Sequence, residues 1–401
     1  MVWKTFTIST PLVLSVPTSV WFFSVTPMPH LLTILISAIA FILLLTALVI
    51  IHEVGHYTLA RLFKVDVEEF GFGLPPKAKT LFRRGMTEFT LNWVPFGGFV
   101  RLKGENEINV EKRFEKGSFA AASIPARLSI LAGGVAMNFL LAFALLLVGF
   151  SVGRWVPNFY ATMEQLEEAA AKGEIFLETG VYITEVLPNT PAAKAGIVKD
   201  TAITSIDGKP VTQPEDVINF QKGKRRVTYE LLEGAEKKVR EVTVELDQGK
   251  SGVAISEFAA KLSAPQRSLS DAIVLAGKET SFMTVQTIKG IGTLVKSLAM
   301  KGRVPEGITG VVGIAVLTHS SVQEGFMTYL RLVALLSLSL AILNILPLPA
   351  LDGGRLLFVF MEMILRRPIN QRFELLINAA GFFLLIGLII IITFNDVIHL
   401  F

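Results

Sequence analysis

Two histidines and a glutamate stand together where a long apolar stretch ends. His52, Glu53 and His56 follow the uncharged run 31–51 in a His-Glu-x-x-His pattern. Histidines at positions i and i+4 share one helix face, so both rings can bind one metal ion, and the glutamate can take a proton from metal-bound water. Ionisable side chains are expensive in or near a bilayer. We therefore interpret these residues as part of a zinc peptidase centre rather than as interfacial histidines.

A centre of this type needs a third protein ligand and an open position for water. The chain has no cysteine, and the acidic residues soon after His56 lie in a basic loop. The better candidate is Asp352, which lies between two prolines in 347–349 and the glycine pair 353–354. Prolines remove helix hydrogen bonds and glycines let the backbone turn, so Asp352 need not follow a regular helix face. Two imidazoles and one carboxylate do not separate zinc from another divalent ion, although zinc is the usual occupant.

The composition places most of the chain in a membrane. Of its 401 residues 51% are hydrophobic and 18% are charged, against about 25% charged residues in ordinary soluble domains. Four uncharged apolar runs reach the roughly 20 residues that a membrane-spanning helix needs. They cover 31–51, 128–152, 332–351 and 375–395. The net charge of +4 is small, and nothing in the sequence calls for a nucleic-acid partner.

Lysine and arginine in the short loops predict the orientation of the spans. Twelve of them lie in 57–127 and four more lie in the link between the last two spans, whereas the N-terminal tail has only Lys4. Both basic loops are therefore predicted to be cytoplasmic, with both chain ends and the long loop between spans two and three outside. On this topology Asp352 lies at the same depth as the histidine pair, near the cytoplasmic side. That favours metal ligation over a merely interfacial aspartate.

Two segments are interpreted as peripheral to the membrane core. Residues 1–29 are apolar, but prolines such as Pro11, Pro17 and Pro27 interrupt a helix. This favours an extended or interfacial outer segment over a cleaved signal peptide. Residues 265–325 form a linker in which apolar side chains such as Ile288 and Val295 recur at helical spacing. Such an amphipathic stretch packs on protein or lies on the membrane surface.

Two regions have the alternating pattern of β-strands. In the long outer loop, short strands, two short helices and an Asp-Gly turn at 207–208 predict a β-rich domain over 176–258. In the first cytoplasmic loop, apolar and polar residues alternate along 87–94. Gly85 precedes this segment and a Pro-Phe-Gly-Gly stretch follows it. This predicts a β-hairpin tucked between helices, with an edge that could hold an extended substrate.

The β-rich region resembles a bacterial PDZ domain. The resemblance rests on 186–196, which reads Val-Leu-Pro-Asn-Thr-Pro-Ala-Ala-Lys-Ala-Gly, and on 206–211. Lys199 stands where the family has a glycine before Asp200. PDZ domains bind extended peptide ends by adding a strand to a sheet edge. A spacer domain with a degenerate groove is the alternative.

The chain as a whole resembles the site-2 protease family, in the branch of the bacterial regulator of sigma-E protease. The shared motifs are His52-Glu53-x-x-His56, Asn344-x-x-Pro347-x-x-x-Leu351-Asp352-Gly353, and the segments 69–76, 95–102 and 133–139. Similar enterobacterial proteins carry two PDZ domains where this chain has room for one. The resemblance implies a membrane α-helical protein whose metalloprotease core of four transmembrane helices lies in 30–160 and 326–401. A PDZ domain is inserted between these parts, and a β-hairpin loop associates with the membrane.

The same resemblance implies roles for individual residues. Zinc would be bound by His52, His56 and Asp352, with Glu53 as the general base. Asn344 and Pro347 would bind substrate, although an intrahelical hydrogen bond is an alternative for Asn344. The implied activity is cleavage of transmembrane segments of single-span proteins, such as trimmed anti-sigma factors or remnant signal peptides, in regulated intramembrane proteolysis. The implied location is the bacterial inner membrane.

Two other classes of function remain open at this point. One is a non-catalytic PDZ scaffold held in the membrane, which Glu53 disfavours because a binding module has no use for it. The other is a membrane-anchored zinc peptidase acting on polypeptides in the cytoplasm. Asp352 disfavours this second class, because a site built from two spans faces the bilayer interior.

Overall fold

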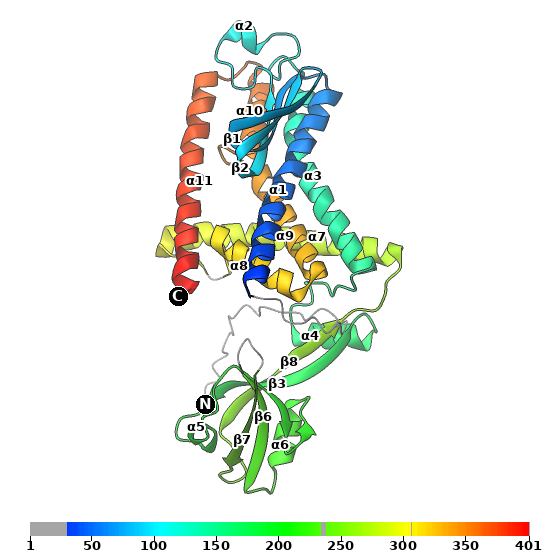
Figure 1. Ribbon diagram of the computed structural model, residues 1–401, viewed down its shortest axis with the longest axis vertical. Helices are drawn as coiled ribbons and strands as arrows, with labels where there is room; N and C mark the ends of the chain where they lie inside the picture. Colours follow the sequence, from blue (N-terminus) through cyan, green and yellow to red (C-terminus); the bar gives the residue numbers. More distant parts are fainter. Residues whose placement is uncertain (1–29, 234–237, 306, 401) are drawn as a thin grey trace. The chain divides into compact units, whose positions relative to one another are not determined.

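A computed structural model describes residues 30–233, 238–305 and 307–400, and the predicted outer segment 1–29 lies outside them. The described chain divides into two compact units (Figure 1). One unit contains the residues up to Gly153 and those from Arg267 onward, and the other is Arg154–Gln266.

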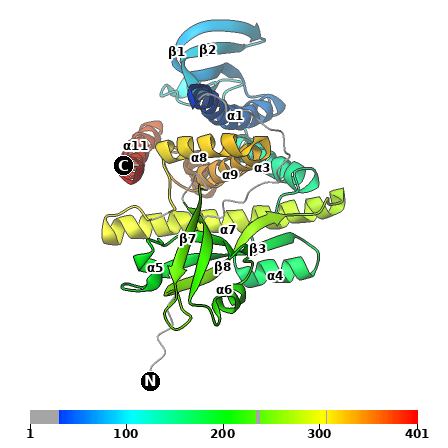
Figure 2. The same ribbon diagram turned by 60° about the horizontal axis from the view of Figure 1, so that its bottom comes forward.

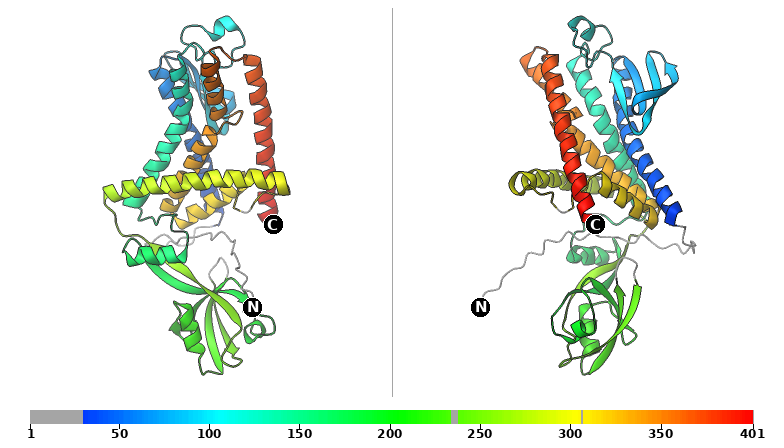
Figure 3. Two further views of the ribbon diagram at one scale, coloured as in Figure 1. Left: turned by 180° about the vertical axis from the view of Figure 1, so that it is seen from behind. Right: turned by 60° about the vertical axis from the view of Figure 1, so that its left-hand side comes forward.

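Four helices of the first unit are long and apolar enough to cross a membrane. They are α1 (His30–Leu62), α3 (Ile124–Ser151), α9 (Phe326–Ile345) and α11 (Gln371–Leu400). The four predicted spans are therefore confirmed as helices. The first three pack against one another, whereas α11 stands apart from them over much of its length (Figure 3).

The third predicted span, 332–351, was wrong at its C-terminal end. Helix α9 stops at Ile345, and Leu346 adopts an extended conformation. The break precedes Pro347, and the residue before a proline is disfavoured in the helical conformation. Asp352 then begins a separate helix, α10 (Asp352–Leu365), which the sequence did not predict. The candidate ligand therefore sits at a helix start and not at the end of a span.

The predicted hairpin is present and longer than expected. Strand β1 (Val67–Arg84) pairs with β2 (Thr87–Leu102), and β2 packs along α1 (Figure 2). The first half of β2 pairs with two different parts of β1, one on each side. Thr90, for example, pairs with both Gly71 and Thr80. The predicted segment 87–94 thus lies largely inside the pairing and does not present the free edge that we expected. A short helix, α2 (Val110–Arg113), follows in the same loop.

Between α3 and the third span, the first unit also contains two further helices, α7 (Leu269–Lys301) and α8 (Val311–Glu324). Helix α7 runs across the spans and not along them (Figure 3). Most of its buried side chains lie in its first half, among them Ala272, Leu275, Ala276 and Met283. In the second half Leu294 is buried, whereas Ile288 and Val295 are exposed.

The second unit is the predicted β-rich domain. Its sheet runs in the order β7-β6-β4-β3-β8, with β5 paired to β4, and its core includes fully buried Ile183, Ile206 and Tyr229. The predicted short strands and the two short helices are present. Helix α4 lies against β3 and β8 (Figure 2). In chain order the elements are α4 (Met163–Ala171), β3 (Phe176–Val186), α5 (Pro191–Lys194), β4 (Thr201–Ile206), β5 (Lys209–Pro210), α6 (Pro214–Gln221), β6 (Arg226–Glu233), β7 (Lys238–Glu245) and β8 (Val253–Ser263).

Candidate metal centre

Helix α1 presents two histidines on one buried face. The Nε2 atoms of His52 and His56 lie 3.1 Å apart, and the ring centroids are 4.8 Å apart in a T-shaped arrangement. Their i, i+4 spacing brings the rings together one turn apart on the same face. Both residues are buried, at 6% and 8% exposure. Two nitrogen atoms therefore converge on one point inside the first unit.

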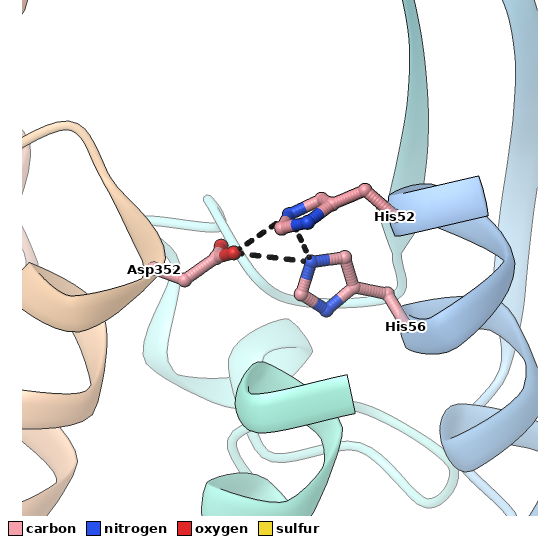
Figure 4. Close-up of side chains that lie close together, drawn as sticks. All are labelled: His52, His56 and Asp352. Atoms are coloured by element: carbon pink, nitrogen blue, oxygen red, sulfur yellow. Dashed lines mark hydrogen bonds and ion pairs between the residues drawn. The ribbon is translucent and has the colours of Figure 1, made fainter. Parts of the chain in front are cut away.

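Asp352 adds an oxygen atom to the same point from the start of α10 (Figure 4). Its Oδ2 lies 2.8 Å from Nε2 of His52 and 3.3 Å from Nε2 of His56. Ligand atoms bound at about 2 Å to a tetrahedral zinc ion lie roughly 3.3 Å from one another. The donor types, the burial and the spacing all fit a zinc site with one position left for water. The structure thus brings together the three residues that the sequence singled out as ligands.

Close contact between α1 and α3 sets the position of the histidine face. A Cβ atom on Gly55 would lie 2.1 Å from the carbonyl oxygen of Gly133. The two helices could therefore not lie this close together if residue 55 had a side chain. Gly134 lies beside the Nε2 atoms of both rings. A Cβ atom on it would be 2.4 Å from Nε2 of His56 and 2.6 Å from Nε2 of His52. These glycines leave the space that the two imidazoles occupy.

The orientation of His56 is fixed by a backbone group of α3. Nδ1 of His56 lies 2.8 Å from the carbonyl oxygen of Ile130. A carbonyl can only accept, so the Nδ1–H donates, which leaves the Nε2 lone pair free for a metal ion. The sequence gave no sign of this contact, because any residue at position 130 would supply the same carbonyl oxygen.

Tight packing of α10 against the preceding segment places Asp352. A Cβ atom on Gly353 would lie 2.0 Å from the carbonyl oxygen of Leu346, and one on Gly354 would lie 2.3 Å from that of Leu348. The glycine pair was expected to turn the backbone. Both glycines instead lie inside α10 and permit close approach, while Ala350 takes the positive φ of 70°.

A cavity of about 120 Å³ opens on the centre, and Glu53, His56 and Asp352 line it. Val100 and Phe99 of β2 line the same cavity, and a Cβ atom on Gly98 of β2 would lie 3.9 Å from Cγ of Glu53. At roughly 30 Å³ per water molecule, the cavity has room for a few waters beside Glu53. The hairpin therefore forms one wall of the site.

The same cavity has a charged wall that the sequence analysis missed. Arg355, one turn after Asp352 on α10, forms an ion pair with Glu105 of the loop after β2. The sequence analysis did not pair Arg355 with Glu105, which lies 250 positions earlier in the chain.

The two remaining predicted site residues lie outside the ligand cluster. Asn344 is half-buried in the last turn of α9, and Pro347 is exposed in the segment that follows. Both residues belong to the chain just before α10, and each has exposed surface.

Comparison with known proteins identifies the family. The profile of peptidase family M50 matches residues 40–388. A Clostridium perfringens protein assigned by name to the zinc metalloproteases is 30% identical over 361 residues, which are 89% of this chain and 97% of that protein. Zinc metalloprotease RasP of Bacillus licheniformis is 26% identical over 448 positions, covering 91% of this chain and 99% of RasP. The chain therefore belongs to peptidase family M50, the site-2 protease family, and is a zinc metalloprotease with four helices able to cross a membrane.

Proposed function

We propose that this protein is an intramembrane endopeptidase that cleaves the transmembrane segments of single-span proteins. The observation that carries the proposal is the place of the histidine pair. His52 and His56 lie within α1, the most apolar of the four candidate spans, and not in a domain outside the membrane. A substrate that reaches them would come from the bilayer side.

In this proposal His52, His56 and Asp352 hold the zinc ion and Glu53 is the general base. Zinc, when bound, supplies a Lewis acid that makes water nucleophilic near neutral pH. The Glu53 carboxylate accepts the proton of the attacking water and returns it to the amide nitrogen as the carbon–nitrogen bond breaks. Support comes from the shared cavity, in which Glu53 lies beside two of the three ligands. Val100 of β2 lines the same cavity as the carboxylate.

A transmembrane helix hides its peptide bonds in its own hydrogen bonds, so the substrate must unwind before water can attack. An unpaired strand edge can hold the unwound segment in extended form. Because 87–94 is largely paired inside the hairpin, we assign this role to 98–102. That segment pairs with β1 on one side only among the described residues, and Gly98 and Val100 in it lie beside Glu53. Asn344 and Pro347 are proposed to contact the backbone of the unwound substrate segment.

The β-rich unit is proposed to be one PDZ domain that admits substrates already trimmed by another protease. The order of strands supports this assignment, because β8 ends the sheet and α6 packs beside it. An extended peptide end could add to that edge. Anti-sigma factors and remnant signal peptides are the substrate types that we propose. The setting is the bacterial inner membrane, with both chain ends and the PDZ domain outside and the active site near the cytoplasmic side.

One experiment separates intramembrane cleavage from cleavage of soluble polypeptides. The protein and its Glu53→Gln variant are each produced with a tagged single-span substrate in vesicles, and with a soluble peptide of the same cleaved sequence. We expect cleavage of the membrane substrate by the unaltered protein only. Equal cleavage by both proteins would contradict the role of Glu53. Cleavage of the soluble peptide but not of the membrane substrate would favour a peptidase that acts in the cytoplasm.

A further inference from the structure

Asn138 of α3 is buried beside the metal centre and has no part in the proposed chemistry so far. It has no exposed surface, and its amide lies 3.4 Å from Nδ1 of His52. Ile130, Gly134 and Asn138 are spaced four residues apart, so they share one face of α3. The first of them holds His56 and the second makes space for both rings. The third faces the ring atom of His52 that points away from the metal position.

The side-chain amide of Asn138 points at Nδ1 of His52. Its Nδ2 atom faces Nδ1 of His52, and its Oδ1 atom is buried without a hydrogen-bond partner among the described residues. An amide nitrogen only donates, so Nδ1 must accept and the proton of the ring must lie on Nε2. There it can donate to Asp352 across the 2.8 Å contact.

A bound metal ion reverses this requirement. Ligation takes the Nε2 lone pair of His52, so the neutral ring carries its proton on Nδ1 and needs an acceptor there. A half-turn of the Asn138 amide exchanges its nitrogen and oxygen atoms without moving the residue. The oxygen then faces the Nδ1–H, and the buried oxygen that lacked a partner acquires one. An asparagine side chain can serve both ring tautomers, which an apolar residue cannot do.

We propose that Asn138 is the positioning residue of His52, whose Nδ1–H it accepts when zinc is bound. The inference rests on the ligand role proposed for His52. Asn138 touches neither substrate nor metal and acts only through the orientation and tautomer of the ring. Its own backbone is held separately, because Ser337 of α9 donates its hydroxyl to the Asn138 carbonyl oxygen at 2.8 Å.

The test is the zinc dissociation constant of the full-length protein in detergent, measured by competition with a chelator. Asn138→Leu keeps the volume and removes both polar atoms, and we expect zinc to bind about 10- to 100-fold more weakly, as for other outer partners of metal ligands. Asn138→Asp supplies an acceptor and is expected to bind zinc at least as tightly as the unaltered protein. Ser337→Ala is the matched control, since it perturbs the same residue through its backbone and is expected to leave zinc affinity unchanged.

Thermal unfolding of the metal-free variants checks that each one folds. Unaltered zinc affinity in Asn138→Leu would overturn the inference, as would equal losses in Asn138→Leu, Asn138→Asp and Ser337→Ala. His52→Ala separates this inference from the function on which it rests. If His52→Ala binds zinc normally, the proposed ligand set is wrong. If His52→Ala loses zinc while Asn138→Leu retains it, only the positioning role fails.

Discussion

The carboxylate of Asp352 lies 2.8 Å from Nε2 of His52, although 300 positions separate the two residues in the chain. His52 belongs to the first span and Asp352 begins the helix that follows the third. A donor set divided in this way forms only when α1, α9 and α10 are packed correctly. The three donor atoms therefore lie together only when these helices have packed.

Removing this carboxylate should abolish tight zinc binding. Asp352→Asn keeps the shape of the side chain but replaces the charged oxygen with an amide. We expect zinc affinity to fall by at least about 100-fold, the upper end of the loss caused by removing an outer partner of a ligand. Zinc content after dialysis and peptide-bond cleavage report the effect. Asp396→Asn is the control, because Asp396 is a buried carboxylate of the same unit that accepts from the N–H groups of Gly310 and Gly313. A normal zinc content in Asp352→Asn would refute the assignment of this ligand.

A methyl group on the face of α3 should displace the histidine rings. The Cβ atom of Gly134→Ala would lie 2.4 Å from Nε2 of His56, where the ring or the helix must move. Over-packing costs roughly 1–3 kcal/mol, so zinc affinity should fall by about tenfold or more. Gly387→Ala in α11 has nothing within 4 Å of its Cβ position and should bind zinc normally. Zinc titration of both variants makes the comparison. Equal affinities would show that the space beside the Nε2 atoms of the two histidines does not determine zinc affinity.

The segment 98–102 should contact the substrate directly. We would place a photo-crosslinking phenylalanine analogue at Phe99, which lines the cavity, in the Glu53→Gln background so that substrate stays bound. Phe82 is the control position, because it belongs to the opposite edge of the hairpin and is exposed. Irradiation with a tagged single-span substrate should give a cross-link at position 99 and little at position 82. The reverse pattern would move the substrate to the other edge.

Acid should weaken the β-rich unit through Asp207. Hydrogen bonds from the Lys224 ammonium, 2.6 Å away, and the Thr228 N–H lower the pKa of this carboxyl below its usual value. A lowered folded-state pKa stabilises the fold above the unfolded pKa of about 4, and this stability is lost as pH falls through the folded pKa. At neutral pH, Asp207→Asn should lower the free energy of unfolding by about 1 kcal/mol or less, because the pair is partly exposed.

Thermal unfolding between pH 3 and 7 measures this effect. The difference between Asp207→Asn and the unaltered protein should shrink as pH falls. Asp200→Asn is the control, since Asp200 is exposed and also has a positive φ that asparagine tolerates. A constant difference between Asp207→Asn and the unaltered protein across this pH range would mean that the carboxylate charge is not the cause.

Long apolar runs and paired ligand motifs were readable from the sequence because each depends on residue type alone. The spans, the histidine pair and the choice of Asp352 follow from such signals. Helix α10 was missed because the glycine pair 353–354 was interpreted as a turn, whereas both glycines lie inside the helix. Most of β1 was missed because glycines, the Pro75-Pro76 pair and charged residues interrupt its alternation.

The parts of the site that α3 supplies could not be derived from residue types. The contact of His56 with Ile130 uses a backbone carbonyl oxygen, which every amino acid has. Gly134 and Asn138 acquire meaning only when α3 is known to face the histidines. Their four-residue spacing in the second span is a signal in retrospect, because small and polar residues on one helix face mark helix contacts within membranes.

The position of the broken peptide bond tests the central claim most directly. A single-span substrate in vesicles is incubated with the unaltered protein and with Glu53→Gln, and the masses of the products locate the cut. An intramembrane protease with its metal centre in α1 should cut inside the substrate's apolar segment, and Glu53→Gln should give no product. A cut only in the soluble flank of the substrate, or the same product from Glu53→Gln, would contradict the account.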